Sequence, residues 1–203
     1  MKKKQTMTGS EIIVEVLAEQ GVETIFGYSG GAILPTYDAV FQYNEKHKNA
    51  MPLIVPANEQ GAGFMASGYS RATGKPGVVM VTSGPGATNT VTPVRDAMAD
   101  SIPMIVICGQ VNRSSIGSDA FQEAPITSVM GSVAKHVFLV TDEDKLAATI
   151  RAAFEISSSG RPGPVVVDIP KDIQTASIDF DTSSTLNINA YRERVQSIVN
   201  NRV

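Results

Sequence analysis

The segment Leu53-Ile54-Val55-Pro56-Ala57-Asn58-Glu59-Gln60-Gly61-Ala62-Gly63-Phe64 joins a strand-like run to a helix-like run. Its apolar start is typical of a short buried strand. Asn58 can cap a helix, which places Glu59 in the first helical turn. Acids are common in that turn because the helix dipole stabilises them by about 0.3–1 kcal/mol. Position alone therefore favours a structural role for Glu59 over a catalytic one, and the small residues after it let another surface approach closely.

Strand and helix patterns alternate on both sides of this junction. Strands are expected over residues 22–26, 53–55, 77–82, 103–108, 136–140 and 164–169. Helices are expected from Ser10, which is placed to cap the first of them, from near Ala32, from Asn58, and over residues 87–99 and 142–157. This alternation predicts an α/β fold: a doubly wound, mainly parallel six-stranded sheet with helices on both faces.

Composition places the chain among ordinary globular proteins. It has 203 residues, of which 42% are hydrophobic and 18% charged, which suits one domain with a full core. The net charge of −3 gives no bias toward nucleic acid, and Lys2-Lys3-Lys4 is short enough to be a solvated tail. No apolar stretch reaches membrane-spanning length and no signal-peptide core follows the lysines, so we expect a cytoplasmic protein without a membrane partner.

Metal and thiol chemistry find little support. The single cysteine, Cys108, lies in an apolar run and is expected to be a buried thiol. The two histidines, His47 and His136, occur in unrelated contexts, so no metal site is predicted.

Four loops are expected beyond the carboxyl ends of the strands, where open parallel α/β sheets bind ligands. They cover residues 27–31, 58–60, 82–86 and 109–122. Their glycines permit close approach of a ligand, although any single one is also an ordinary loop glycine. The dinucleotide fingerprint is missed because Asn89 stands at its last position and no acid ends the next strand. A P-loop sequence is absent too, so the loops predict a flat, mostly neutral ligand part rather than a pyrophosphate.

Six segments carry a family resemblance. In chain order they read Gly27-Tyr28-Ser29-Gly30-Gly31-Ala32, Asn58-Glu59-Gln60-Gly61-Ala62, Thr82-Ser83-Gly84-Pro85-Gly86-Ala87-Thr88-Asn89, Asp119-Ala120-Phe121-Gln122-Glu123, Lys135-His136 and Ser159-Gly160-Arg161-Pro162-Gly163-Pro164. Together they resemble the N-terminal domain of the acetolactate synthase (acetohydroxyacid synthase) catalytic subunit, a thiamine-diphosphate enzyme. The similarity covers about residues 8–174. Asn58, Ser29 and Asn112 depart from the family's usual His, Pro and Pro.

The resemblance implies a set of roles. Glu59 would hydrogen-bond a nitrogen of the aminopyrimidine ring of thiamine diphosphate and exchange a proton with it, which makes the cofactor reactive toward pyruvate. It also implies cofactor contacts for Tyr28, Ser29, Gly30, Gly31, Thr82, Pro85, Asn89 and Gln122, and a catalytic role for Gln122. Phe121 and Lys135 would line the substrate pocket, although Lys135 reads equally as a solvated surface charge. Arg161 matches a position that contacts FAD, which many members bind, and its alternative is a turn arginine.

The resemblance also bears on domains and partners. Residues 1–178 are expected to form the pyrimidine-binding domain, and residues 179–203 a linker and the start of a further, middle domain. The Gly-Asp-Gly motif with which the family holds Mg²⁺ and the diphosphate does not occur in the sequence, so the isolated chain is expected to be inactive. The family implies condensation of two 2-oxo acids (pyruvate with pyruvate or 2-ketobutyrate) in branched-chain amino acid biosynthesis, a homodimer or larger homo-oligomer, and a regulatory small subunit. Two alternatives stay open: the pyrimidine-domain subunit of a split 2-oxo acid decarboxylase, and a non-catalytic association module.

Overall fold

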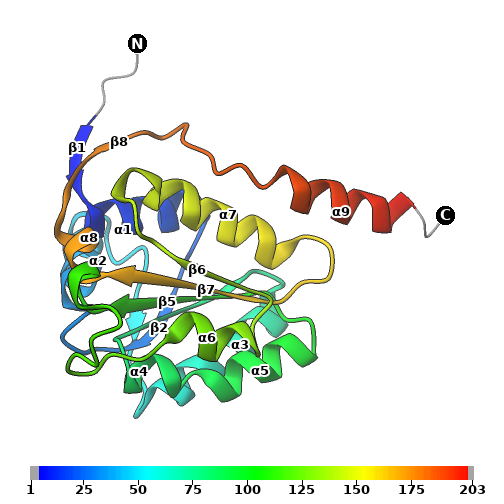
Figure 1. Cartoon of the computed structure of the whole chain (residues 1–203), viewed down its shortest axis with the longest axis horizontal. Coiled ribbons are helices and arrows are strands. Elements are labelled where there is room, and N and C mark those ends of the chain that lie inside the picture. The colour runs from blue at the N-terminus through cyan, green and yellow to red at the C-terminus, as the bar shows by residue number, and fades with distance from the viewer. Residues whose placement is uncertain (1–4, 201–203) are drawn as a thin grey trace.

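A six-stranded parallel sheet forms the centre of the structure (Figure 1). The computed structural model describes residues 5–200, so Lys2-Lys3-Lys4 and the last three residues lie outside the described part. The strand order is β3-β2-β4-β5-β7-β6, and every neighbouring pair runs parallel. Helices cover both faces, which confirms the predicted doubly wound α/β fold.

The strands of this sheet are β2 (Ile25–Tyr28), β3 (Leu53–Ile54), β4 (Gly77–Val81), β5 (Met104–Gln110), β6 (His136–Leu139) and β7 (Pro164–Pro170). One face is covered by α1 (Gly9–Glu19), α2 (Leu34–Lys46) and α7 (Leu146–Ser158). The other face is covered by α3 (Glu59–Thr73), α4 (Pro85–Thr88), α5 (Val91–Ala99) and α6 (Ile126–Gly131) (Figure 1).

Strand β5 shows how one segment serves both cores. All seven of its residues are buried. Ile105 and Ile107 pack under α1, α2 and α7, whereas Val106 and Cys108 pack under α3, α5 and α6, because successive side chains of a strand point to opposite faces. Cys108 is therefore the buried thiol that the sequence predicted.

The cap of α1 differs from the prediction, because Thr8 and not Ser10 precedes the helix. Thr8 Oγ1 accepts a hydrogen bond from Glu11 N at 3.2 Å, and Glu11 Oε2 accepts one from Thr8 N at 2.7 Å. This reciprocal pair is a capping box, which satisfies two backbone donors at once. Ser10 is the second residue of the helix and donates instead to the carbonyl of Gln174 at 2.9 Å.

Two other element boundaries also differ. The helix predicted over residues 87–99 is divided into α4 and α5, because Pro93 would lie in the interior of one continuous helix, where it has no N–H to donate. It lies instead in the first turn of α5. The strand predicted at residues 22–26 begins only at Ile25 and continues to Tyr28.

A second, two-stranded sheet joins the two ends of the domain. Strand β1 (Gln5–Thr8) pairs antiparallel with β8 (Ser177–Phe180), which follows the short helix α8 (Lys171–Thr175). β8 crosses the predicted domain boundary at residue 178, and residues 181–188 after it form no helix or strand. Helix α9 (Asn189–Asn200) then returns toward α7, where Arg192 Nε contacts Glu155 Oε1 at 2.6 Å. Within residues 5–200, no helix has the length and apolarity that a membrane crossing requires.

Candidate functional site

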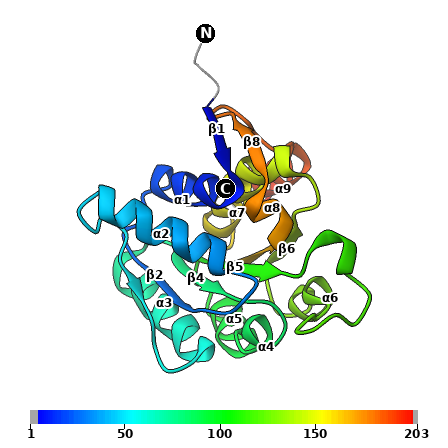
Figure 2. The same cartoon turned by 90° about the vertical axis from the view of Figure 1, so that its left-hand side faces the viewer.

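The candidate site lies where the neighbouring strands β2 and β4 end. After β2 the chain turns to α2 on one face of the sheet, and after β4 it turns to α4 and α5 on the other. Figure 2 views the molecule from the side on which the strands end, with α2 and α4 on opposite sides of the sheet. Such a switch point opens a crevice between the diverging loops, and doubly wound folds bind ligands there.

Glu59 lies beside this switch point, at the first position of α3. Asn58 caps the helix as predicted, with its Oδ1 accepting from Gly61 N at 2.8 Å. The Glu59 side chain is only 9% exposed. Its Oε2 accepts a hydrogen bond from Asn89 Nδ2 at 3.0 Å, whereas Oε1 has no hydrogen-bond partner within residues 5–200. One carboxylate oxygen is thus fixed and the other is available to a ligand.

Thr82 packs between two of the glycine turns. A methyl group added to Gly30 would lie 2.6 Å from Thr82 Cβ, and one added to Gly86 would lie 2.6 Å from Thr82 Cγ2 and 3.5 Å from Glu59 Oε1. Thr82 Oγ1 accepts a hydrogen bond from Ala32 N at 3.2 Å. Glycine is therefore required on both sides of Thr82, and the turn after β2, the turn after β4 and Glu59 form one continuous surface.

Tyr37, which the sequence did not single out, lies beneath this surface. Its hydroxyl donates to the carbonyl of Met80 at 2.9 Å. Burial, and then the nearby charge of Glu59, raise the pKa of Tyr37 above its ordinary value. The phenol therefore stays neutral and acts as a hydrogen-bond donor. Its only signal in the sequence is its place on the buried stripe of α2.

Gln122 reaches the same region through its backbone. Gly84 has a φ of +51°, and a methyl group on it would lie 2.7 Å from the carbonyl carbon of Gln122. The turn after β4 and the loop after β5 therefore touch at this point. The side chain of Gln122 is exposed, and that of its neighbour Phe121 is 88% exposed. Of the other residues predicted to contact a cofactor, four lie exposed where β2 and β4 lead into the next helices: Tyr28, Ser29, Gly31 and Pro85.

The loop that carries Gln122 has a defined shape because Glu123 closes it. Glu123 accepts hydrogen bonds from the backbone N–H groups of Gly117 and Ala120, the latter at 3.1 Å. These N–H groups, Gly117 first, lower the pKa of the Glu123 carboxyl. The carboxylate is thus held by its own loop, so that Phe121 and Gln122 are presented outward from a fixed turn.

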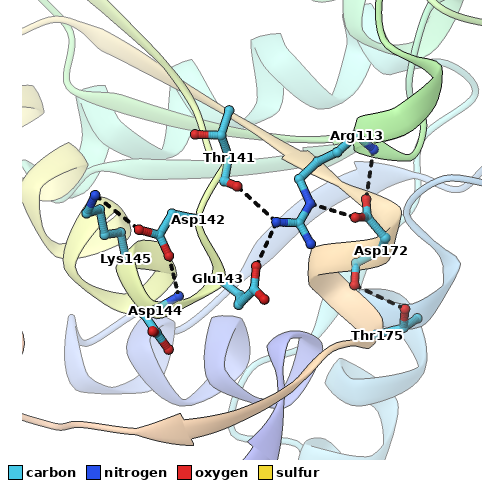
Figure 3. A network of polar contacts seen from close by, with 8 residues as sticks. All are labelled: Arg113, Thr141, Asp142, Glu143, Asp144, Lys145, Asp172 and Thr175. Carbon is cyan, nitrogen blue, oxygen red and sulfur yellow. Dashed lines mark hydrogen bonds and ion pairs between the residues drawn. The ribbon is translucent and has the colours of Figure 1, made fainter.

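Arg113 anchors the other end of this loop (Figure 3). It lies in the short 3₁₀ helix η1 (Arg113–Ser115). Its Nε donates to Asp172 Oδ2 of α8 at 2.6 Å, and its Nη1 donates to Glu143 Oε2 at 2.7 Å and to the carbonyl of Thr141 at 3.0 Å. Exposed ion pairs contribute only about 0–1 kcal/mol each, so the main effect of Arg113 is to fix the direction in which the chain leaves β5.

Lys135 and Arg161 lie at the end of the sheet where the strands begin, whereas Glu59 lies at the end where they finish. Each stands just before a strand, and in a parallel sheet the residues before strands gather at the amino ends. Lys135 Nζ donates to the carbonyls of Ile156 and Ser159, and Arg161 donates to Ser101 Oγ and to the carbonyls that end α5. Both line a second cavity of about 550 Å³ together with Tyr191, Arg194, Val195 and Ile198. The structure therefore does not bring them together with the other predicted site residues.

Across residues 5–200, no three His, Cys, Asp or Glu side chains are close enough together to hold an ion. Glu59 combines a buried acid, an available carboxylate oxygen and nearby glycine turns.

Comparison with known proteins gives consistent matches. Residues 7–130 match the family model described as thiamine pyrophosphate enzyme, N-terminal TPP binding domain. The chain is 52% identical over 92% of its length to the mitochondrial acetolactate synthase catalytic subunit of Saccharomyces cerevisiae. It is 49% identical over 86% of its length to the acetolactate synthase isozyme 2 large subunit of Escherichia coli, and 49% identical over 82% to the chloroplastic acetolactate synthase 3 of Brassica napus. The matched stretches span 27%, 31% and 25% of these relatives, respectively.

Proposed function

The chain belongs to the thiamine pyrophosphate enzymes, since more than half of it matches their N-terminal TPP binding domain, and from this we propose that it supplies the pyrimidine-binding half of an acetolactate synthase active site. The observation that carries the proposal is Glu59: a buried acid at a helix start, with one oxygen bonded to Asn89 and the other without a protein partner. Its place at the β2–β4 switch point is where this fold type accepts ligands.

The residues around Glu59 fit an aminopyrimidine ring. Gly30 and Gly86 pack directly against Thr82, because a side chain at either position would meet it, and this close packing joins both turns and Glu59 into one surface against which a flat group can lie. Glu59 Oε1 is available to hold and exchange a proton at a ring nitrogen, while Asn89 keeps Oε2 in place. When bound, thiamine diphosphate supplies the electron sink for breaking and forming carbon–carbon bonds next to a carbonyl. This chain would bind the ring, orient it and exclude water from the proton-transfer position.

For the substrate we propose 2-oxo acids, pyruvate with pyruvate or with 2-ketobutyrate, condensed with decarboxylation in branched-chain amino acid biosynthesis. The names of the relatives, an acetolactate synthase catalytic subunit and an acetolactate synthase large subunit, support this reading. Gln122 is proposed as a catalytic residue that contacts the cofactor, and Phe121 as part of the substrate pocket, because their loop touches the turn after β4 and presents both side chains outward.

The second cavity suits a different ligand. Arg161, Arg194 and Lys135 give it a positive lining, and Tyr191 adds an aromatic face. The positive side chains would attract the negative groups of an anionic molecule, and the tyrosine ring would stack on its flat rings. We therefore propose this cavity as the contact site for FAD. On this reading Lys135 serves the FAD cavity and not the substrate pocket. Arg161→Ala should then weaken FAD retention and leave Glu59 chemistry intact.

Further parts complete the proposed enzyme. We propose that Mg²⁺ and the diphosphate are held outside this chain, that the domain proper extends to about residue 178 and is followed by a linker, and that the enzyme is a cytoplasmic homodimer or larger homo-oligomer with a regulatory small subunit. Four exposed apolar residues support an interface beside the site: Ile54 at the end of β3, Val55 just after it, and Phe64 and Met65 on α3. The compartment varies among relatives, whose names include mitochondrial and chloroplastic forms.

A chimera tests the proposal. This chain replaces the matching stretch of the Escherichia coli relative, and acetolactate formation from pyruvate is measured with and without thiamine diphosphate. We expect cofactor-dependent turnover that is lost when Glu59→Gln is introduced. A folded chimera without turnover would favour the non-catalytic association module. Decarboxylation of 2-oxo acids without condensation would favour the split decarboxylase.

A further inference from the structure

Gln174, at the end of α8, is a completely buried polar side chain with every side-chain polar atom engaged. Its exposed fraction is 0%. Nε2 donates to the carbonyls of Ala32 at 2.8 Å and Ile169 at 3.0 Å, and Oε1 accepts from Thr36 Oγ1 at 2.9 Å. Both N–H groups of the amide therefore donate, and its oxygen accepts one hydrogen bond. Such an arrangement fixes the orientation of whatever it bonds.

The group that it fixes belongs to the first glycine turn. Ala32 and Gln174 are 142 positions apart in the chain. The N–H of Ala32 donates to Thr82 Oγ1, and its carbonyl accepts from Gln174. A methyl group on Gly109 would lie only 2.6 Å from that carbonyl oxygen, so β5 also packs closely against it. Both backbone polar groups of Ala32 are thus held by side chains of other segments: Thr82, just after β4, and Gln174 of α8.

Helix α8 holds a second loop as well. Asp172, two residues before Gln174, binds Arg113 at the root of the loop that carries Gln122 (Figure 3). Residues two apart on a helix point in different directions. The five residues of α8 therefore connect the two loops that flank Glu59, one through an exposed ion pair and one through a buried amide.

We propose that Gln174 is a positioning residue of the cofactor site: by holding the carbonyl of Ala32, it sets the direction of Gly30 and Gly31 relative to Glu59. The identity of the ligand rests on the proposed function, whereas the positioning of the turn does not. Glycines have no side chains to lock them in place, so the orientation of this turn depends on bonds such as those to Ala32.

The test uses the 203-residue chain and two variants. Gln174→Met has a similar shape and cannot hold Ala32. Thr36→Val removes the hydroxyl that donates to Gln174 Oε1 in the same buried network, and it leaves the bond between Gln174 and Ala32 intact. Backbone amide exchange and chemical shifts of Gly30, Gly31 and Ala32 are recorded by NMR without ligand. Thiamine is then titrated to millimolar concentration. Each protein is measured at a temperature the same number of degrees below its own Tm, so that differences in stability do not affect the comparison.

We expect Gln174→Met to speed amide exchange in the 30–32 turn and to weaken thiamine binding about fivefold, since a preorganised turn is lost. Thr36→Val should change that affinity by less than about twofold. An undisturbed turn in Gln174→Met, or equal weakening in both variants, would overturn the proposal. If the wild-type chain shows no shifts with thiamine while Gln174→Met still loosens the turn, the proposed function fails and the positioning role of Gln174 stands.

Discussion

Asn89 Nδ2 lies 3.0 Å from Glu59 Oε2, across 30 positions of sequence. Asn89 follows α4, and Glu59 begins α3. This bond therefore links two strand-to-helix junctions at the carboxyl ends of the strands. The amide occupies one carboxylate oxygen and leaves the other facing Gly86. The chemical asymmetry of Glu59 is therefore a product of the fold and not of the helix cap alone.

Glu59→Gln is expected to abolish cofactor activation in the complete enzyme and to leave the fold intact. The amide keeps the size of the side chain but cannot take up a proton from a ring nitrogen, and general acid–base groups of this kind contribute about 10²–10⁴-fold. The measurement is deuterium exchange at C2 of bound cofactor, with Tm as the fold control. Glu23→Gln, an exposed acid that pairs with Lys75, is the matched variant. Undiminished C2 exchange in Glu59→Gln would refute the assignment.

Gly86→Ala should impair the site without harming the rest of the domain. The added methyl would lie 2.6 Å from Thr82 Cγ2, so Thr82 must shift, and it would come into van der Waals contact with Glu59 Oε1 at 3.5 Å. Gly68→Ala is the control, because a methyl there meets nothing within 4 Å and should stabilise α3 by about 0.5–1 kcal/mol. Cofactor affinity and Tm are measured for both. Equal cofactor affinity in the two variants would contradict the proposed geometry.

Asp168 should make stability depend on pH. It is 1% exposed on β7, with Oδ2 bonded to Gln110 Nε2 at 3.0 Å and Oδ1 without a partner in the described residues. Burial raises the pKa of Asp168 from its usual 3.8 to about 7. The folded state therefore binds the proton more tightly than the unfolded state. Stability is full below about pH 4, falls as pH rises toward 7 by at most about 1.4 kcal/mol per unit, and is constant above.

The check is the difference in the free energy of unfolding between wild type and Asp168→Asn, measured from pH 4 to pH 8. The neighbouring thiol of Cys108 has a pKa raised well above its usual value, chiefly by burial, so it stays protonated throughout. The variant should gain stability relative to wild type as pH rises, and level off above pH 7. A difference that is flat with pH would show that Asp168 titrates near its usual value in the folded chain.

The chain alone is expected to bind thiamine diphosphate weakly. It contains neither a Gly-Asp-Gly motif nor a P-loop, so the diphosphate has no dedicated site and only the ring contacts remain. Calorimetric titration with cofactor and Mg²⁺ measures this directly. Micromolar affinity would mean that a phosphate site exists in this chain.

Self-association should follow from the apolar surface beside Glu59. Phe64 and Met65 of α3 are 42% and 45% exposed, and a specific dimer should bury roughly 1,200–2,000 Å² in total. Sedimentation at tens of micromolar should show a dimer that Phe64→Glu disrupts. Phe41→Glu, at a 58% exposed position on α2, is the control. A wild-type monomer under these conditions would remove α3 as an association face.

Local signals in the sequence were sufficient for part of the structure. Asn58 caps α3 because its side chain needs only a backbone N–H three residues away, and the alternation of apolar and helical runs sufficed for the sheet. Glycines 84 and 86 were expected to permit close approach of a ligand, which stays a prediction; in the structure Gly84 approaches Gln122 and Gly86 approaches Thr82. Helix capping, hydrophobic periodicity and glycine in turns each depend on residues that are close together in the chain. They can therefore be recognised from the sequence alone.

Tertiary structure alone decided which of these pieces meet. The bonds from Asn89 to Glu59 and from Gln174 to Ala32 span 30 and 142 positions, and no local pattern encodes them. They arise because parallel pairing places the carboxyl ends of β2, β4, β5 and β7 at the same end of the sheet. Lys135 and Arg161 precede strands, so the same pairing places them at the other end, where the strands begin. A parallel sheet sorts residues by whether they follow or precede a strand, and only the assembled sheet shows which loops then lie together.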